Sequence, residues 1–139
     1  MPATTVPIRV FLADHSGIIR ERVAAMLVAR GMSVVGHGDT PRECIDEILA
    51  TRPDVVVLEV ELDGGSGLQV LRAVRLLEPG IACLVFTIHA DPAFCLRYLA
   101  EGARRFLDKA TEFDQLASAI EQAFAWTQEQ PDTDRSGAH

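Results

Sequence analysis

The sequence predicts an α/β domain built around a five-stranded parallel sheet with helices on both faces. Short runs rich in apolar residues alternate five times with segments whose apolar residues recur every three to four positions. The chain has 139 residues, of which 48% are hydrophobic, enough for one domain with one core. Strands that alternate with helices in this way favour parallel pairing, with helices packed on both faces of the sheet.

The apolar runs are the expected strands. They cover residues 8–13, 33–38, 54–60, 81–87 and 104–107. The run 54–60 is the most apolar, and we expect it at the centre of the sheet, because central parallel strands are buried on both faces.

Helix-start and helix-stop residues bound the first two helices. Asp14 or Ser16 can cap the first helix, which Gly31 ends. The second begins at residues 39–41, with proline in its first turn, and stops at residues 52–53. The residues expected to face the core along these helices are Ile19, Val23, Met26, Leu27, Cys44, Ile45, Ile48 and Leu49.

Three more helices are expected in the second half of the chain. The third follows a turn at residues 62–66 and is broken at 79–80, and the fourth opens at 91–92. Gly102 closes the fourth, and the last runs from residue 111 to about 128. The residues expected to face the core are Leu68, Leu71, Val74 and Leu77, then Phe94, Cys95, Tyr98 and Leu99, then Phe113, Leu116, Ala117, Ile120 and Phe124.

Right-handed crossovers leave few arrangements for such a chain. We predict a flavodoxin-like (βα)5 three-layer sandwich with strand order 2-1-3-4-5. In that order the functional crevice lies at the carboxyl ends of the first and third strands. Asp14 follows the first strand and Glu59 ends the third, so the two carboxylates are expected to meet there.

Composition bounds the domain and its partners. We expect a single domain over residues 7–128, an N-terminal extension at 1–6 and a disordered polar tail at 129–139. No apolar stretch approaches the roughly 18 residues of a membrane span, and no secretory signal is evident, so we expect a cytoplasmic chain without membrane contact.

The net charge of −7 argues against nucleic-acid binding. The widely spaced Cys44, Cys83 and Cys95 are expected to be buried free thiols.

The segment around Glu59 carries the strongest functional signal. Residues 53–68 form an apolar strand that ends in a carboxylate and runs into a glycine-rich turn. This segment resembles the phosphoacceptor segment of bacterial response-regulator receiver domains, and the resemblance covers residues 7–128. In that family the position of Glu59 is an aspartate, which becomes phosphorylated.

Further positions match the family in the same order. Asp14 matches the second of two acidic residues that help bind magnesium, whereas Ala13 replaces the first. Glu61 matches the position whose backbone carbonyl ligates the metal, and residues 63–67 stand where the family commonly has Pro-Gly-x-Asp-Gly. The resemblance therefore implies Asp14, Glu59 and Glu61 as a metal site, one that binds magnesium weakly or not at all.

Two more strands end in matching residues. Thr87 corresponds to the hydroxyl residue that contacts the phosphoryl group, and Lys109 to the lysine that pairs with its oxygens. Phe106 matches the switch aromatic. Taken singly, Thr87 could be an ordinary strand-end hydroxyl and Phe106 a core residue. Residues 102–110 look like receivers that precede a helix-turn-helix output domain, which we do not expect in this chain.

The departures from the family predict a weakened acceptor. Glu59 moves its oxygens outward by about one C–C bond, roughly 1.5 Å, and a misplacement near 1 Å can cost about a hundredfold in rate. Ala13 removes a carboxylate that would hold the metal's water shell. Asp14 and Glu59 facing Lys109 leave a charge of about −1, so the site can persist as an ion pair that requires no cofactor.

The leading hypothesis is an atypical receiver, or pseudo-receiver, that is not an enzyme and acts by protein–protein contact. By resemblance, its partner (a kinase, an output protein or a second copy in a homodimer) would bind at about residues 91–128. One alternative is a weakly phosphorylatable receiver or phosphate sink. Another is an enzyme on a flavodoxin-like scaffold, with Glu59 and Asp14 as an acid–base pair.

His15 and His89 are expected at the rim of the crevice, as exposed side chains, metal ligands or pH sensors. Trp126 is expected as an exposed anchor for a partner or packed against the tail.

Overall fold

The computed structural model describes residues 6–129, and its core is a five-stranded parallel sheet. The strands of this sheet are β1 (Arg9–Ala13), β2 (Ser33–Gly38), β3 (Val55–Leu58), β6 (Ala82–Thr87) and β7 (Arg105–Asp108). Their order across the sheet is β2-β1-β3-β6-β7, and every neighbouring pair is parallel. Counted along the chain within this sheet, the order is the predicted 2-1-3-4-5, and the flavodoxin-like fold is confirmed.

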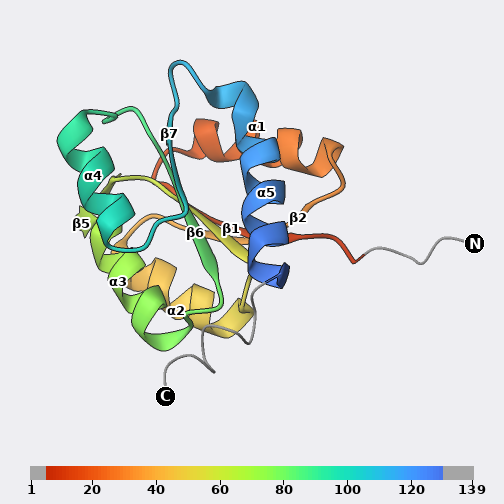
Figure 1. Ribbon diagram of the computed structural model, residues 1–139, viewed down its shortest axis with the longest axis horizontal. Coiled ribbons are helices and arrows are strands. Elements are labelled where there is room, and N and C mark those ends of the chain that lie inside the picture. The colour runs from red at the N-terminus through yellow and green to blue at the C-terminus, as the bar shows by residue number, and fades with distance from the viewer. Residues whose placement is uncertain (1–5, 130–139) are drawn as a thin grey trace, which may run out of the picture.

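Helices cover both faces of the sheet (Figure 1). They are α1 (Gly17–Ala29), α2 (Pro41–Thr51), α3 (Gly67–Leu77), α4 (Pro92–Ala100) and α5 (Leu116–Glu129), with a 3₁₀ turn at Phe113–Gln115. The buried residues of α1 and α5 form one half of the core with one face of the sheet, and those of α2, α3 and α4 form the other half. The result is the predicted three-layer sandwich.

The predicted caps form at three helices. Ser16 caps α1 by accepting a hydrogen bond from the Ile19 backbone N–H, and Thr40 caps α2 in the same way from Glu43. Gly31, just past α1, has φ +83°, a conformation that glycine adopts without steric cost. Asp91 caps α4, which begins at Pro92 as expected.

The expected turn at residues 62–66 is instead a short hairpin. Strand β4 (Glu61–Leu62) pairs antiparallel with β5 (Gly65–Ser66). Gly64 between them has φ +75°, which suits a tight two-residue connection. The hairpin follows β3 directly and leads into α3, so it fixes the path of the chain beside Glu59. The third strand is correspondingly shorter than predicted, ending at Leu58 rather than residue 60.

Several residues expected in the core lie at the surface. Leu77 is 52% exposed and is the last residue of α3. On α4 only Tyr98 is buried, while Phe94 and Leu99 are exposed. The apolar residues of α4 have helical spacing, but they occupy more of the helix surface than packs against the rest of the protein. This is because α4 packs near the margin of the sheet, at the edge strand β7. Leu49 is also exposed, and Cys95 is only half-buried.

Two predicted segments lie almost wholly outside the described residues. They are the N-terminal extension at 1–6 and the polar tail at 129–139, so the proposed domain boundaries stay predictions. Within residues 6–129, no helix is long and apolar enough to cross a membrane.

The three free thiols differ in their surroundings, and this difference predicts their reactivity. Burial raises the pKa of Cys44 and of Cys83 to about 12. Because the thiolate is the reactive form, roughly one in ten thousand of these thiols is ionised at pH 8. We expect Ellman's reagent to modify one cysteine, Cys95, in the folded chain and three in denaturant, followed by absorbance.

The matched control is Cys95→Ser, which should abolish the fast native reaction and leave two thiols reactive in denaturant. A second cysteine reacting at a similar rate in the folded chain would contradict the packing described for Cys44 and Cys83.

Candidate functional site

Four polar side chains converge at the carboxyl edge of the sheet. Within residues 6–129 the buried polar or charged residues are Asp14, Glu59, Thr87 and Lys109. They come from the ends of β1, β3, β6 and β7, which are separated by long stretches of sequence. Burying charged groups is costly unless they are paired, so their meeting identifies this edge as the candidate site.

The parallel register brings these residues together. Ala13 lies opposite Leu58, Leu58 opposite Val85, and Thr87 opposite Asp108. The ladder continues one residue further at two places: the Glu59 N–H donates to the Ala13 carbonyl at 2.9 Å, and the Lys109 N–H donates to the Thr87 carbonyl at 2.9 Å. Each functional side chain therefore starts from a fixed backbone position at the end of a buried strand.

Glu59 accepts hydrogen bonds on both carboxylate oxygens. Its Oε1 accepts from Lys109 Nζ at 2.5 Å. Its Oε2 accepts from the Val60 N–H at 2.7 Å, from the Thr87 hydroxyl, and more weakly from the Glu61 N–H at 3.4 Å. The Glu59 side chain thus accepts hydrogen bonds from Lys109, from Thr87 and from the backbone N–H groups of the two residues that follow it.

Lys109 bridges the two buried carboxylates. Its Nζ lies 2.6 Å from Asp14 Oδ2 as well as 2.5 Å from Glu59 Oε1. The other Asp14 oxygen, Oδ1, accepts from the Ser16 N–H at 2.9 Å, just before α1 begins. Lys109 is the only lysine in the sequence. One positive charge therefore faces two negative ones, and every buried side-chain polar atom of the described residues has a hydrogen-bond partner.

The residues present do not fit a magnesium ion as they are arranged. All four oxygens of Asp14 and Glu59 already accept hydrogen bonds, two of them from Lys109. The resemblance assigns the backbone carbonyl of Glu61, not its carboxylate, to the metal, and the carboxylate is directed to His89 Nε2 at 3.0 Å, so it does not replace the carboxylate missing at Ala13. Among residues 6–129 no group of three or more His, Cys, Asp or Glu side chains could hold a metal. A magnesium ion, which requires near-octahedral oxygen ligands, would have to displace the lysine.

Two histidine–carboxylate pairs border the site. His89 pairs with Glu61 on one side, and His15 Nδ1 lies 3.8 Å from Asp63 Oδ1 on the other. Both histidine side chains are about 40% exposed, which favours the rim interpretation over metal ligation. The His89 backbone N–H also donates to Thr87 Oγ1 at 3.0 Å, so the loop after β6 is tied to the buried network.

Phe106 lies outside the hydrogen-bonded group. It is half-buried on β7 and packs edge-to-face against Tyr98 of α4, with ring centroids 6.2 Å apart. Tyr98 is buried, and this burial raises the pKa of its hydroxyl. The predicted switch aromatic thus links β7 to α4 rather than to Glu59.

Gly67 allows the closest backbone approach in the site. A Cβ on this residue would lie 2.3 Å from the Glu59 carbonyl oxygen, so only glycine fits. The Gly67 N–H donates to the Val60 carbonyl at 2.8 Å. The start of α3 is therefore locked against the backbone that carries Glu59.

Sequence reasoning found the charged members of this site and missed its backbone donors. Asp14, Glu59, Thr87 and Lys109 are in direct contact, whereas the Glu61 side chain turns away toward the rim. The N–H groups of Ser16, Val60 and His89 complete the network. Backbone donors have no residue-type signal, so only the path of the loops could reveal them.

Comparison with known proteins gives a consistent family. The profile of the response regulator receiver domain matches residues 10–121. Response regulator GacA of Pseudomonas aeruginosa is 29% identical over 119 residues, which cover 85% of this chain and 56% of that protein. The probable transcriptional regulatory protein NarL of Mycobacterium tuberculosis is 32% identical over 114 residues, covering 81% and 53%. The chain spans about half the length of these curated relatives.

Solved structures agree with this match. A two-component response regulator of the LuxR family from Aurantimonas sp. SI85-9A1 superposes with a TM-score of 0.82 at 30% identity, covering 86% of each chain. The signal receiver domain of NarL from Mycobacterium tuberculosis superposes with a TM-score of 0.80 at 31% identity, covering 86% of this chain and 97% of that one.

The lysine bridge predicts a large effect on stability. Lys109→Met should lower the free energy of unfolding by about 3–5 kcal/mol, because it leaves two buried carboxylates without a counter-charge. Urea denaturation at pH 7, followed by circular dichroism, measures this loss. The matched control is Arg30→Met, which breaks the half-exposed pair with Glu121 and should cost no more than about 1 kcal/mol. Equal losses in the two variants would contradict the central position of Lys109.

Proposed function

Since the chain belongs to the response regulator receiver domain family of two-component signalling, we propose that it is an atypical receiver whose output does not depend on phosphorylation. It acts by contact with another protein and is not an enzyme. All three cysteines are free, which suits the reducing cytoplasm in which we expect it to act.

The observation that carries this proposal is the simultaneous contact of Glu59 with Lys109 and Thr87. By family resemblance, these two residues contact the oxygens of the phosphoryl group once the acceptor is modified. Here the carboxylate itself takes both donors, together with the Val60 N–H. The groups that would stabilise a transferred phosphoryl are already engaged before any transfer.

The chemistry of transfer is weakened at the same place. Phosphoryl transfer relies on positioning and on charge stabilisation by a metal that bridges the reacting oxygens. Ala13 supplies no carboxylate, and Lys109 lies between Asp14 and Glu59, where its charge opposes that of a cation. The nucleophilic oxygens of Glu59 accept hydrogen bonds from cationic and neutral donors, which lowers their reactivity.

Glu59 also biases the fold toward one conformation. Its carboxylate holds Thr87, and Thr87 holds the His89 backbone in the loop before α4. A carboxylate carries a charge of −1 and two acceptor oxygens, whereas a phosphoryl group adds about −1.5 to −2 and three oxygens. We therefore propose partial mimicry of the phosphorylated state that does not require an incoming phosphoryl group.

The proposed contact surface is formed by α4, β7 and α5, residues 92–129. Strand β7 is an edge strand, and helices α4 and α5 lie on either side of it (Figure 1). The exposed large apolar residues of these elements are Phe94, Leu96, Leu99 and Trp126. Trp126 is 38% exposed and stacks under the Arg104 guanidinium at 3.7 Å, so an aromatic anchor is presented on this surface. A second copy or an output protein fits such a surface.

Phosphorylation is the direct test of the proposal. After incubation with acetyl phosphate and magnesium, we expect the intact mass of the wild-type chain to stay unchanged. The Glu59→Asp variant shortens the acceptor, frees room at Lys109 and Thr87, and should gain phosphoryl mass.

Glu59→Gln serves as the matched control, because it keeps the length of the side chain and removes the nucleophilic carboxylate. Phosphoryl mass on the wild type but not on Glu59→Gln would overturn the proposal and make this chain a working phosphorylation switch. An unmodified Glu59→Asp variant would show that departures other than Glu59, Ala13 among them, are enough to prevent transfer.

The contact surface makes a separate prediction. We expect the wild type to form dimers in sedimentation velocity runs at rising protein concentration, and Leu96→Glu to shift it to monomer, because a charge replaces a 71% exposed leucine on α4. Leu76→Glu is the matched control, since Leu76 is 81% exposed on α3. A monomeric wild type, or an equal effect of both substitutions, would contradict dimerisation through this surface.

A further inference from the structure

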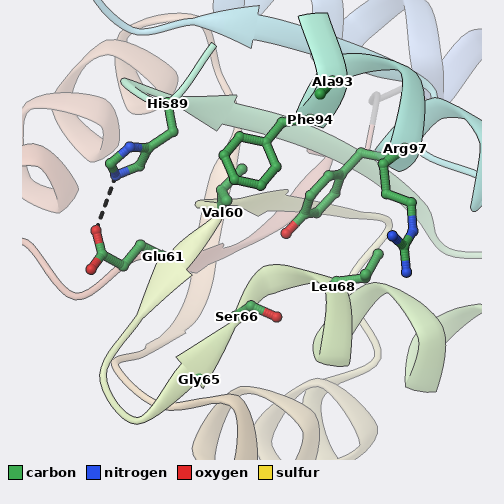
Figure 2. Close-up of a pocket in the computed structure, with 10 residues that line it drawn as sticks. Val60, Glu61, Gly65, Ser66, Leu68, His89, Ala93, Phe94 and Arg97 are labelled. Atoms are coloured by element: carbon green, nitrogen blue, oxygen red, sulfur yellow. Dashed lines mark hydrogen bonds and ion pairs between the residues drawn. The ribbon is translucent and has the colours of Figure 1, made fainter. Parts of the chain in front are cut away.

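A cavity of about 590 Å³ opens beside the site, between the β4–β5 hairpin and α4. Figure 2 shows residues from four segments around it: Val60 and Glu61 after β3, Ser66 and Leu68 at the start of α3, His89 after β6, and Phe94 and Arg97 on α4. Its volume lies within the roughly 300–1,000 Å³ of ordinary small-molecule sites. None of the chemistry proposed for Glu59 uses this cavity.

The two ends of the cavity differ in character. Figure 2 shows the paired His89 and Glu61 at one end, Arg97 at the other, and the Phe94 ring between them. Val60, Leu68 and Tyr98 add apolar surface to the wall. Phe94 is 39% exposed although it is a large aromatic residue, so one of its faces is left for a flat apolar group.

The Arg97 end carries excess positive charge. Arg97 and Arg72 both pair with Glu101, through contacts of 3.4 Å and 2.9 Å. These arginines lower the pKa of the Glu101 carboxyl, with Arg72 as the larger cause, so Glu101 contributes one full negative charge against two positive ones. Arg97 uses its Nε in this pair, and its terminal nitrogens make no hydrogen bond to residues 6–129. They can donate to a ligand in the paired geometry that a carboxylate accepts.

We propose that this cavity binds a small aromatic monocarboxylate. The ring lies against Phe94 and Leu68, and the carboxylate accepts hydrogen bonds from Arg97. A dianion is disfavoured, because Glu61 borders the opposite end and the chain as a whole carries a net charge of −7. Charge complementarity at one end and an apolar middle together select this ligand class.

The cavity shares backbone with the Glu59 network. The N–H groups of Val60 and Glu61, which line the cavity, donate to Glu59, and the His89 N–H donates to Thr87. A ligand that moves these wall segments therefore changes the contacts of Glu59 and Thr87. This signalling consequence rests on the proposed function, whereas binding itself does not.

The experiment is a titration of the ¹⁵N-labelled full chain with 2-naphthoate, followed by two-dimensional NMR. We expect saturable shifts of the amide signals of Val60, Leu68 and Phe94. The uncharged 2-naphthamide should bind at least about tenfold more weakly, as should the variant Arg97→Gln, because a charge-assisted hydrogen bond is lost. Arg30→Gln is the matched control, since Arg30 also pairs with a single glutamate at a helix end, and it should bind like the wild type.

Three results would overturn the proposal: no shift at the cavity up to the solubility limit of 2-naphthoate, equal affinity for 2-naphthamide, or equal affinity of Arg97→Gln. The spectrum of Arg97→Gln away from the cavity verifies that this variant is folded. The titration uses no phosphodonor, so its failure leaves the proposed function standing, and phosphorylation of the wild type would leave the cavity proposal standing.

Discussion

The bridge from Lys109 to Asp14 and Glu59 is the interaction on which the site depends. It joins the ends of β1, β3 and β7, which the chain reaches only after long intervening helices. Two carboxylates this close in a buried position would repel each other strongly without a cation between them. The single lysine of the chain supplies that cation, and Thr87 and backbone N–H groups satisfy the remaining oxygens.

This arrangement explains how a receiver can keep its fold while its acceptor changes. Three carboxylates beside one lysine leave a charge of about −2 for a metal to balance, whereas two carboxylates beside Lys109 leave only about −1. By family resemblance, Ala13 removes one carboxylate and so lowers the negative charge of the site, whereas Glu59 keeps the charge of an aspartate and only lengthens its side chain. The side chain one methylene longer reaches Thr87 and its own loop, so polar satisfaction is achieved within the protein itself.

Apolar periodicity was sufficient for the strand order, for the caps of three helices and for the meeting of Asp14 and Glu59 at the sheet edge, whereas Thr87 and Lys109 were assigned to the site by family resemblance. It overestimated the burial of α4, since the spacing of Phe94 and Leu99 shows a helical face but not the width of the surface beneath it. It also missed the β4–β5 hairpin and the backbone donors at Ser16, Val60 and His89. Two-residue strands and N–H groups depend on the path of the chain rather than on residue type.

The cavity lies beside the backbone that donates hydrogen bonds to Glu59. Under the proposed phosphorylation-independent function, a change in the position of α4 would be driven by a contact other than a phosphoryl group. The cavity wall contains His89 and the α4 residues Phe94 and Arg97, and α4 also forms part of the proposed contact surface. A ligand bound there would contact both the loop after Glu59 and α4, the helix in the proposed contact surface. If the ligand binds more tightly to one position of α4 than to another, its binding would favour that position and so affect contact with a partner.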